Sequence, residues 1–232
     1  MLTIGTTMTK RKAAKVQKQA GRAPRAAPAR AHYHHGGLRE ALIGATRQLV
    51  MERGAENFTL ADACRLAGVT TAAPYRHFRS KQEILAEIAS RGFDELKAEA
   101  MAVIAAKGAG TLEALVAMGQ AYVAFAVRET AVFRLMFGQD PALKMAEDVA
   151  GTGHDCFAHL IEQITLYCRK NRVRGDALEI ALRLWTFVHG AASLSIDKDY
   201  LEIAPQLDVN RLIANATPGL LAPAPRRSKA RQ

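Results

Sequence analysis

The chain has 232 residues, and 49% of them are hydrophobic, which is enough for a sizeable core in one large domain or two small ones. No uncharged apolar run reaches the roughly 18 residues that would span a membrane, and the basic N-terminus lacks the apolar segment of a signal peptide. The three cysteines match no zinc-binding spacing. We therefore expect a cytoplasmic protein with reduced thiols and no membrane partner.

The net charge of +10 is concentrated at the two ends of the chain. Residues 1–37 contain eight Lys or Arg and no acid, and residues 222–232 contain four and no acid. Residues 38–91 carry a charge of +2, whereas residues 92–221 carry −4. Basic surface attracts nucleic acid, so this distribution predicts two functional regions. The second region, residues 92–221, has no electrostatic reason to contact nucleic acid.

The first residues, 1–31, are predicted to be a disordered basic arm, because Ala, Lys, Arg and Pro offer little surface to bury. Such an arm either follows phosphates or is a solvated leader without a specific role. The histidines at 32, 34 and 35 have no Cys or carboxylate nearby, so we predict no metal there and an entry to the first helix instead.

An amphipathic helix is predicted over 38–53, with Leu38, Leu42 and Leu49 on its apolar face and Gly54 at its end. It would supply a core to the short motif that follows. The predicted core residues are Leu42, Leu49, Phe58, Leu60, Val69 and Phe78.

Helix-turn-helix spacing follows over residues 59–78. Thr59 and Asp62 form a variant of the capping box at the start of a short helix, and Gly68 breaks that helix at a sharp turn. Thr70 is predicted to cap a second helix that carries residues 75–78. This pattern indicates DNA binding.

A long helix is predicted over about 81–106, because Ser80 and Glu83 form a capping box and an apolar stripe continues to Val103. Its first turn belongs to the helix-turn-helix domain, residues 32–91, and its end to a second domain, residues 92–221. A rigid helix shared in this way can transmit a change from one domain to the other.

The second domain repeats the helical pattern without a strand signal, so the predicted fold class is all-α. Helices are predicted over 112–128 and 132–137, over 141–172 with a potential break near Gly151 and Gly153, and over 209–216, ending at Pro218. Residues 222–232 are predicted to be a basic disordered tail.

The helix that Asp176 caps, residues 177–197, is apolar on nearly every face, which predicts burial all round. The expected cover for its second side is another subunit. The predicted dimer interface comprises Leu184, Val188, Ala191, Ala192 and Leu194.

Residues 38–85 resemble the DNA-binding domain of the TetR family of bacterial regulators, most specifically through Thr59, Gly68-Val69, Tyr75 to Phe78 and Ser80-Lys81. The late segment LWTFVHGAASL is similar to the subgroup with a WHG domain, whose signature would be Trp185, His189 and Gly190. The resemblance implies an all-α homodimer that binds operator DNA. It also implies a C-terminal pocket whose small-molecule ligand releases the DNA.

The candidate DNA contacts combine position on the motif with this resemblance. The first residues of a recognition helix read base edges, and later ones meet phosphate. Arg76 could equally pair with a surface carboxylate. The candidate residues are Thr59, Thr70, Thr71, Ala72, Tyr75, Arg76, His77 and Lys81.

Pro74 stands where many relatives have Leu or Ile. Proline has no amide hydrogen, so it would remove the first hydrogen bond of the second helix. Contacts carried over from relatives to Thr71 and Ala72 are therefore the least secure.

Large apolar side chains of the second domain could line a pocket for a small apolar or aromatic effector, or could simply form its core. A buried His189 could likewise bind a ligand or satisfy an internal hydrogen bond. The candidate lining residues are Phe93, Met101, Phe125, Met136, Phe137, Phe157, Trp185 and His189.

The sequence therefore predicts a ligand-released repressor that acts as a homodimer on double-stranded operator DNA, without cofactor, metal or catalytic residues. An activator or a non-specific nucleic-acid packing protein stays open as an alternative. An enzyme would need a paired acid and base or a nucleophile, and His154, Asp155 and His159 fit a solvated helix face better.

Overall fold

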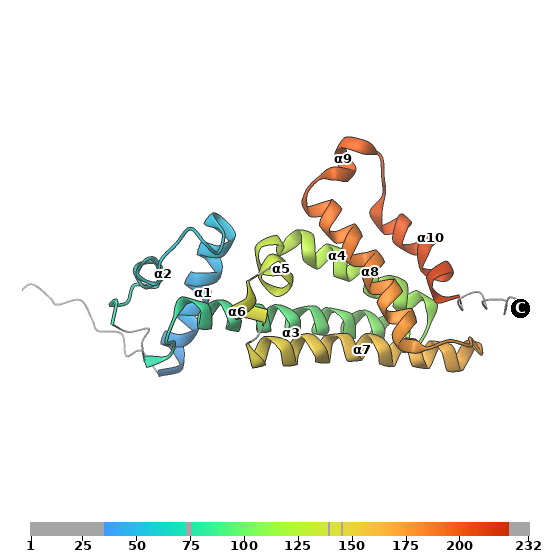
Figure 1. Cartoon of the computed structure of the whole chain (residues 1–232), viewed down its shortest axis with the longest axis horizontal. Helices are drawn as coiled ribbons and strands as arrows, with labels where there is room; N and C mark the ends of the chain where they lie inside the picture. The colour runs from blue at the N-terminus through green and yellow to red at the C-terminus, as the bar shows by residue number, and fades with distance from the viewer. Residues whose placement is uncertain (1–34, 73–75, 139, 145, 223–232) are drawn as a thin grey trace, which may run out of the picture. The chain divides into compact units, whose positions relative to one another are not determined.

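The fold is all-α in the residues that the structure describes, as predicted (Figure 1). The structure is a computed structural model that describes residues 35–72, 76–138, 140–144 and 146–222. The basic arm, the tail beyond Ala222, and Pro74 and Tyr75 lie outside these ranges.

The N-terminal helices form where the local sequence predicts them. Helix α1 spans His35–Arg53 and ends at Gly54, whose φ of 80° is accessible to glycine. Helix α2 spans Leu60–Leu66 and begins with the predicted capping box between Thr59 and Asp62. The chain then turns at Gly68, which has a φ of 69°.

The α-helix predicted to open at Thr70 is not formed by the described residues on either side of 73–75. Thr71 and Ala72 lie in a turn, and Arg76 lies in a 3₁₀ turn. A proline in so short a stretch removes an amide donor, and it disfavours the α conformation in the residue before it. For Thr71, Ala72 and Arg76 the predicted α-helix is therefore wrong.

Helix α3, Lys81–Lys107, is the central element of the fold. Ser80 accepts a hydrogen bond from the Glu83 amide at 3.2 Å, as a capping box requires. The Glu83 carboxylate, however, accepts from the amide of Arg79 and not from that of Ser80. One half of the predicted box is therefore shifted by a residue, and the helix still begins at Lys81.

The remaining helices follow α3 along the chain. They are α4 (Leu112–Arg128), α5 (Thr130–Phe137), α6 (Pro141–Lys144), α7 (Glu147–Asn171), α8 (Ala177–Ile196), α9 (Asp199–Ile203) and α10 (Val209–Leu221). Helix α3 contacts α4, α5 and α7, and it runs beside α7 in Figure 1. Helix α8 contacts α4, α7 and α10.

One predicted helix end was wrong, and the potential break near Gly151 and Gly153 is absent. Helix α7 runs unbroken through both glycines, and Gly153 faces the Phe93 ring of α3. Helix α10 continues past Pro218 to Leu221, whose side chain is 1% exposed. Burial of this last turn offsets the one hydrogen bond that the proline removes.

One hydrophobic cluster extends from the helix-turn-helix into the second region. Leu42, Phe58 and Phe78 of the N-terminal helices share it with Phe93 of α3 and Val188 of α8. Of the predicted core residues, Leu42, Leu49, Phe58 and Phe78 are buried, and Leu60 and Val69 pack against them half-buried. The predicted boundary at residue 91 therefore falls inside a continuous helix and a continuous core.

Helix α8 is not buried all round, and most of the residues predicted to form a dimer interface face the interior of the single chain. The side chains of Leu184, Val188, Ala191 and Ala192 are at most 8% exposed within the single chain, because α4 and α10 cover this face. Only Leu194 of the predicted set is exposed. The uncovered apolar face instead carries Leu178, Leu182 and Leu194.

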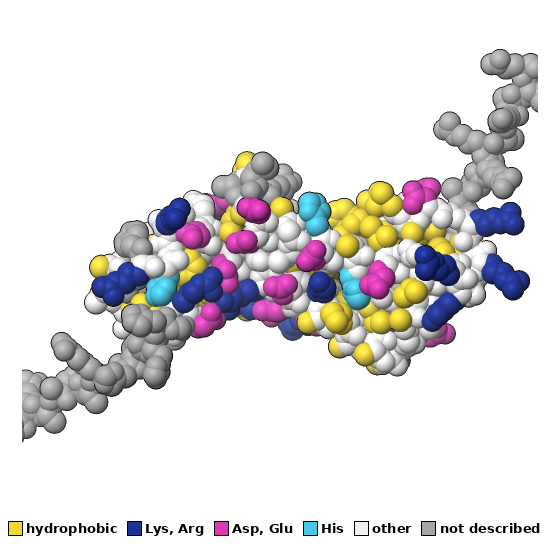
Figure 2. Space-filling model, turned by 90° about the horizontal axis from the view of Figure 1, so that it is seen from below, with side chains coloured by type: hydrophobic (Ala, Val, Ile, Leu, Met, Phe, Trp, Pro, Cys, Tyr) yellow, Lys and Arg dark blue, Asp and Glu magenta, His cyan; other side chains and the backbone are white. Residues whose placement is uncertain are grey.

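No helix in the described ranges has the length and hydropathy required to cross a membrane. On the face seen in Figure 2, side chains of both charges lie interspersed on the half that holds the helix-turn-helix. Hydrophobic side chains gather on the other half of that face.

Candidate functional site

The helix-turn-helix surface is held by a tight turn and by buried aromatic anchors. The Val69 amide donates to the Cys64 carbonyl at 2.9 Å, which closes the turn after Gly68. Phe78 is buried, and the guanidinium of Arg39 lies 5.2 Å from the centre of its ring. These contacts fix both ends of the segment between α2 and α3 to the domain core.

The donors of Thr59 are not available to a phosphate, contrary to the prediction. Its amide and its hydroxyl both donate to the Asp62 carboxylate, at 2.8 and 2.6 Å. These hydrogen bonds hold the pKa of Asp62 below its usual range. Thr59 therefore caps α2, because the capping box takes the two donors that would meet DNA.

Lys81 ties α3 to the start of α2. Its ammonium donates to the Phe58 carbonyl at 2.7 Å and lies 4.2 Å from the centre of the Phe58 ring. An ammonium has three donors, so the half-buried Lys81 can still offer others outward. A DNA contact by Lys81 stays a prediction.

The predicted DNA contacts between Gly68 and Phe78 are exposed or half-buried where the structure describes them. Thr70, Thr71, Ala72 and Arg76 are open to solvent, and His77 is half-buried beside Phe78. Tyr75 lies outside the described residues, so its predicted phosphate contact is untested.

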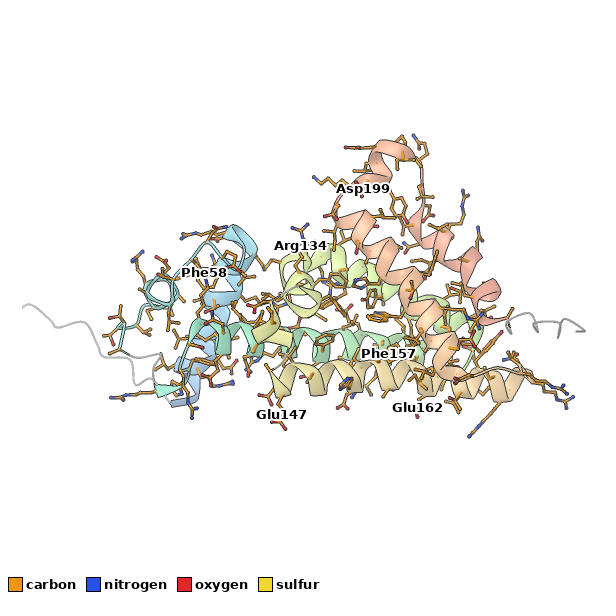
Figure 3. All side chains as sticks on the ribbon, in the orientation of Figure 1. Phe58, Arg134, Glu147, Phe157, Glu162 and Asp199 are labelled. Carbon is orange, nitrogen blue, oxygen red and sulfur yellow. The ribbon has the colours of Figure 1, made fainter. Side chains whose placement is uncertain are left out.

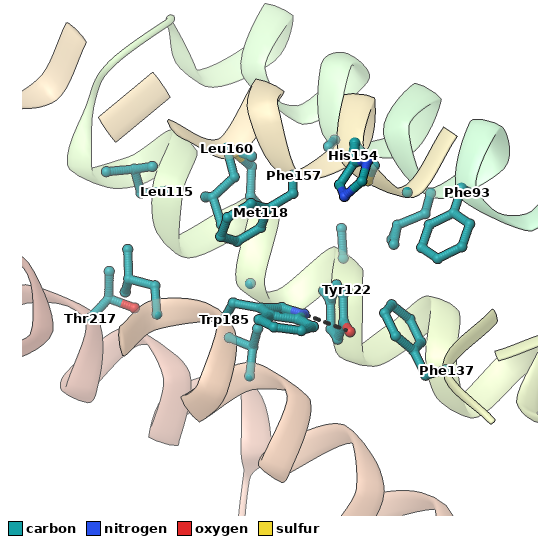
Figure 4. A pocket seen from close by; sticks show the side chains of 18 residues that line it. Phe93, Leu115, Met118, Tyr122, Phe137, His154, Phe157, Leu160, Trp185 and Thr217 are labelled. Atoms are coloured by element: carbon teal, nitrogen blue, oxygen red, sulfur yellow. Dashed lines mark hydrogen bonds between the residues drawn. The ribbon is translucent and has the colours of Figure 1, made fainter. Parts of the chain in front are cut away.

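A cavity of about 360 Å³ lies in the second region, with walls from α3, α4, α5, α7, α8 and α10 (Figure 4). Figure 3 shows Phe157 on the inner side of α7, whereas Glu147 and Glu162 extend away from the protein. The lining is largely aromatic and aliphatic. It comprises Phe93, Leu96, Ala100, Leu115, Met118, Gly119, Ala121, Tyr122, Phe137, Gly153, His154, Cys156, Phe157, Leu160, Leu184, Trp185, Val188 and Thr217.

Four of the eight predicted lining residues, Phe93, Phe137, Phe157 and Trp185, do line the cavity. The other four do not. Met101 is 52% exposed, because it follows Ala100 and is turned about 100° away from the cavity side of α3. Phe125 and Met136 are buried in the core, and His189 lies behind the wall, in contact with Tyr122.

Tyr122 and Met118 are the most important lining residues that the site prediction missed. Their signal was present in the sequence, because Leu115, Met118, Gly119 and Tyr122 stand at i, i+3, i+4 and i+7 and so share one helix face. That periodicity marks a face as buried, but it does not distinguish a packed core from a cavity wall.

A chain of hydrogen bonds gives the cavity its polar feature. The Trp185 indole donates to the Tyr122 hydroxyl at 3.3 Å, and that hydroxyl lies 2.8 Å from Nδ1 of His189 (Figure 4). The ring centres of Phe137 and His189 are 4.9 Å apart, so α5 also packs on this chain.

Burial shifts the ionisable groups at the cavity toward their neutral forms. It raises the pKa of the Tyr122 hydroxyl and, to about 11, that of the Cys156 thiol. It lowers the pKa of His189. At neutral pH the tyrosine, the thiol and the imidazole are therefore uncharged.

Arg47 of α1 links the helix-turn-helix to the cavity-bearing helices. Its guanidinium makes two hydrogen bonds to Glu95 of α3, at 2.6 and 2.8 Å, and one at 2.9 Å to Glu129, which lies between α4 and α5. Helices α4 and α5 carry Tyr122 and Phe137. The Arg47 guanidinium thus links the N-terminal domain to the junction of the two helices that carry Tyr122 and Phe137.

Comparison with known families assigns both regions. A sequence model described as "Bacterial regulatory proteins, tetR family" matches residues 42–88, and one described as "Tetracyclin repressor-like, C-terminal domain" matches residues 115–217. The chain belongs to the TetR family. It is a DNA-binding transcriptional regulator, and its family is one of regulators and not of enzymes.

Solved structures share the fold of this TetR regulator. A protein of unknown function from Rhodococcus sp. RHA1 is 27% identical and has a TM-score of 0.72, with 82% of the regulator and 97% of the other chain covered. A tetR-family regulator from Rhodococcus RHA1 is 15% identical with a TM-score of 0.58, covering 79% and 95%. A fatty acid degradation regulator from Bacillus halodurans is 14% identical with a TM-score of 0.61, covering 82% and 97%.

A comparison of the regulator with curated protein sequences found no match. Membership of the WHG subgroup stays a prediction. Of its proposed signature residues, Trp185 lines the cavity, His189 contacts Tyr122, and Gly190 is exposed on α8.

Proposed function

We propose that the protein is a ligand-released repressor that binds a palindromic operator as a homodimer. The observation that carries this proposal is the physical connection between the DNA-binding surface and the cavity. Helix α3 begins with Lys81 in the helix-turn-helix and provides Phe93, Leu96 and Ala100 to the cavity wall. Both sites therefore share a rigid element and a continuous core.

On the DNA side, the exposed segment after Gly68 is the proposed reading surface. Thr71 can donate to or accept from a base edge, and the methyl group of Ala72 can contact thymine. We propose that Arg76 and His77 contact phosphate, which fixes the position of the protein on DNA but carries no sequence information. The capping role of Thr59 removes it from this proposal.

On the ligand side, a molecule in the cavity would contact Tyr122 of α4 and Phe137 of α5 directly. A shift of these helices would move Glu129, and Glu129 is bonded to Arg47 of α1. DNA is then released if the ligand has a higher affinity for the arrangement in which α1 is displaced. A ligand shifts an equilibrium between two arrangements only through the difference in its affinities for them.

The proposed dimer face is the uncovered side of α8. Leu178, Leu182 and Leu194 are 45%, 43% and 39% exposed, and Gly190 on the same side has no described atom within 4 Å of a built Cβ. An apolar side with a small residue at its centre allows a second α8 to approach closely. We therefore place the interface on this face and not on the buried residues first predicted.

The dimer face is tested by sedimentation of Leu182→Glu, which should shift the protein from dimer to monomer. Met101→Glu is the matched control, because Met101 is also an exposed apolar residue on a helix but lies on α3. A Leu182→Glu variant that stays dimeric would refute this placement.

The function is tested by footprinting genomic DNA with the full chain, followed by transcription from the promoter that it protects. A repressor gives a footprint with two-fold symmetry and lower transcription. Higher transcription from the bound promoter would indicate an activator. Protection without sequence preference would indicate a packing protein and refute the proposal.

A further inference from the structure

The chemistry of the cavity wall selects a class of effector. We propose that the cavity binds a neutral aromatic compound of about two rings that donates one hydrogen bond to the hydroxyl oxygen of Tyr122. The inference rests on the proposed role of this cavity as the effector site, and it adds which molecules the site accepts.

The size of the ligand follows from the volume of the cavity. A cavity of roughly 150 Å³ lined by apolar side chains holds one benzene molecule. The cavity here measures about 360 Å³, a little more than twice as much. The wall carries two aromatic pairs, Phe93 with Phe137 and Phe157 with Trp185, whose ring centres lie 5.3 and 5.6 Å apart in edge-to-face contact. The ring surfaces that these pairs leave open to the cavity suit an aromatic ligand (Figure 4).

The neutral charge follows from the composition of the wall. Among the described residues that line the cavity, none is Asp, Glu, Lys or Arg. The histidine of the lining, His154, is exposed at the edge of the wall and not enclosed by it. A carboxylate or an ammonium buried among the other lining residues would lose its hydration without gaining an ion pair, which is costly. The wall therefore discriminates against charged ligands.

The donor requirement follows from the direction of the hydrogen bonds. An indole N–H can only donate, so the Tyr122 oxygen accepts from Trp185. We assign the Tyr122 hydrogen to Nδ1 of His189, with the imidazole hydrogen on Nε2, because the other tautomer would leave the buried hydroxyl hydrogen without an acceptor on His189. What the Tyr122 oxygen still offers the cavity is a lone pair.

The hydroxyl of Thr217, also in the wall, can likewise only accept a hydrogen bond from a ligand. Thr217 is buried, and its hydroxyl donates to the Ile213 carbonyl at 2.7 Å, so its oxygen too has only acceptor capacity left. Figure 4 shows Thr217 at the left and Tyr122 to the right of Trp185, which lies between them. Tyr122 lies among the aromatic side chains, so we assign the ligand donor to Tyr122 and use Thr217 as the comparison.

The test measures binding of three matched probes to the full chain without DNA. The probes are 4-cyclohexylphenol, its methyl ether and 4-cyclohexylbenzoate, which differ only in the polar group and approximate a two-ring compound. Trp185 is the chain's single tryptophan and lies in the wall, so its fluorescence reports occupancy directly, and calorimetry confirms the affinity.

We expect the phenol to bind about three- to tenfold more tightly than the methyl ether, as one neutral hydrogen bond allows, and the carboxylate to bind more weakly than both. In Tyr122→Phe this preference should vanish while the methyl ether keeps its affinity, which also shows that the cavity is intact. Thr217→Val should keep the preference.

Equal binding of the phenol and the methyl ether, tighter binding of the carboxylate, or no binding of any probe would overturn the inference. So would a preference that survives in Tyr122→Phe or is lost in Thr217→Val. These measurements contain no DNA. A phenol preference without any probe effect on the operator complex would therefore leave the ligand class standing and refute ligand-controlled release.

Discussion

Single glycines decide how closely two helices approach. A methyl group at Gly92 of α3 would lie 2.7 Å from the sulfur of Met136 and from a methyl carbon of Val132, both on α5. The absent side chain is therefore required for the crossing of α3 and α5, which holds Phe137 at the cavity.

We predict that Gly92→Ala lowers the free energy of unfolding by about 1 kcal/mol, since overpacking costs roughly 1–3 kcal/mol and the gain in helix propensity returns about 1 kcal/mol. Gly44→Ala on α1 is the matched control, because no described atom lies within 4 Å of its built Cβ, and it should stabilise. Urea unfolding at one protein concentration compares them, and equal stabilisation by both would contradict the packing argument.

His189 gives the protein a sensitivity to mild acid. Burial lowers its pKa in the folded protein, so below about pH 6.5 the unfolded chain binds a proton more readily than the folded one. Its contribution to stability is present above that pH and is lost as the pH falls. The slope from one proton is at most about 1.4 kcal/mol per pH unit.

His189→Asn should flatten the loss of stability between roughly pH 7 and pH 5, because an amide oxygen can still accept from Tyr122 but does not titrate. Thermal unfolding across this range measures the slope. His159→Asn on α7, where His159 contacts Glu162, serves as the control and should retain the slope. If both variants or neither flatten it, His189 is not responsible.

Among the elements, the junction of α4 and α5 is where the two regions are joined most directly. Arg47 reaches Glu95 of α3 and Glu129 at this junction. Arg91 of α3 makes a comparable pair of hydrogen bonds to Glu40 of α1, at 2.6 and 2.8 Å, but is not bonded to the junction. The two arginines thus make the same kind of ion pair, but only Arg47 of the two is bonded to the junction of α4 and α5.

We predict that Arg47→Met reduces the release of operator by a cavity-bound phenol roughly two- to thirtyfold, the range in which single residues modulate coupling. Arg91→Met should cost similar stability, since both remove partly exposed ion pairs worth about 1 kcal/mol, and should leave release intact. Fluorescence anisotropy of labelled operator with and without probe measures the coupling. Equal losses in both variants would argue against a specific route through the junction.

At the scale of the whole molecule, the distribution of charge separates affinity from specificity. The eight Lys and Arg of residues 1–37 carry no acidic neighbours, whereas residues 38–221 have a slight excess of acid. General attraction to DNA would therefore come largely from the ends, and sequence preference from the surface after Gly68.

Deletion of residues 1–30 should flatten the slope of log K against log salt by about 0.9 for each phosphate that the arm neutralises, and should keep the sequence preference. Deletion of residues 223–232, which removes four basic residues, is the comparison for the other end. An unchanged slope after the first deletion would make the arm a solvated leader.

Local signals in the sequence determined where most helices begin and end. The caps at Thr59, Thr111 and Asp176 and the break after Arg53 lie where predicted, because a cap depends on a few neighbouring residues. The family and the all-α fold could be predicted for the same reason. A local rule failed where packing overrode it, at Pro218 of α10.

The tertiary structure alone decided which apolar faces became core, cavity wall or exposed surface. Periodicity identified the apolar faces of α8 but not which neighbours cover them, so Leu184 and Val188 were assigned to a dimer interface and proved to line the cavity. Tyr122, Trp185 and His189 meet only because α4 packs on α8, and Arg47 reaches Glu129 only because α1 packs on α5. Contacts between residues far apart in the chain depend on helix packing, which no local pattern encodes.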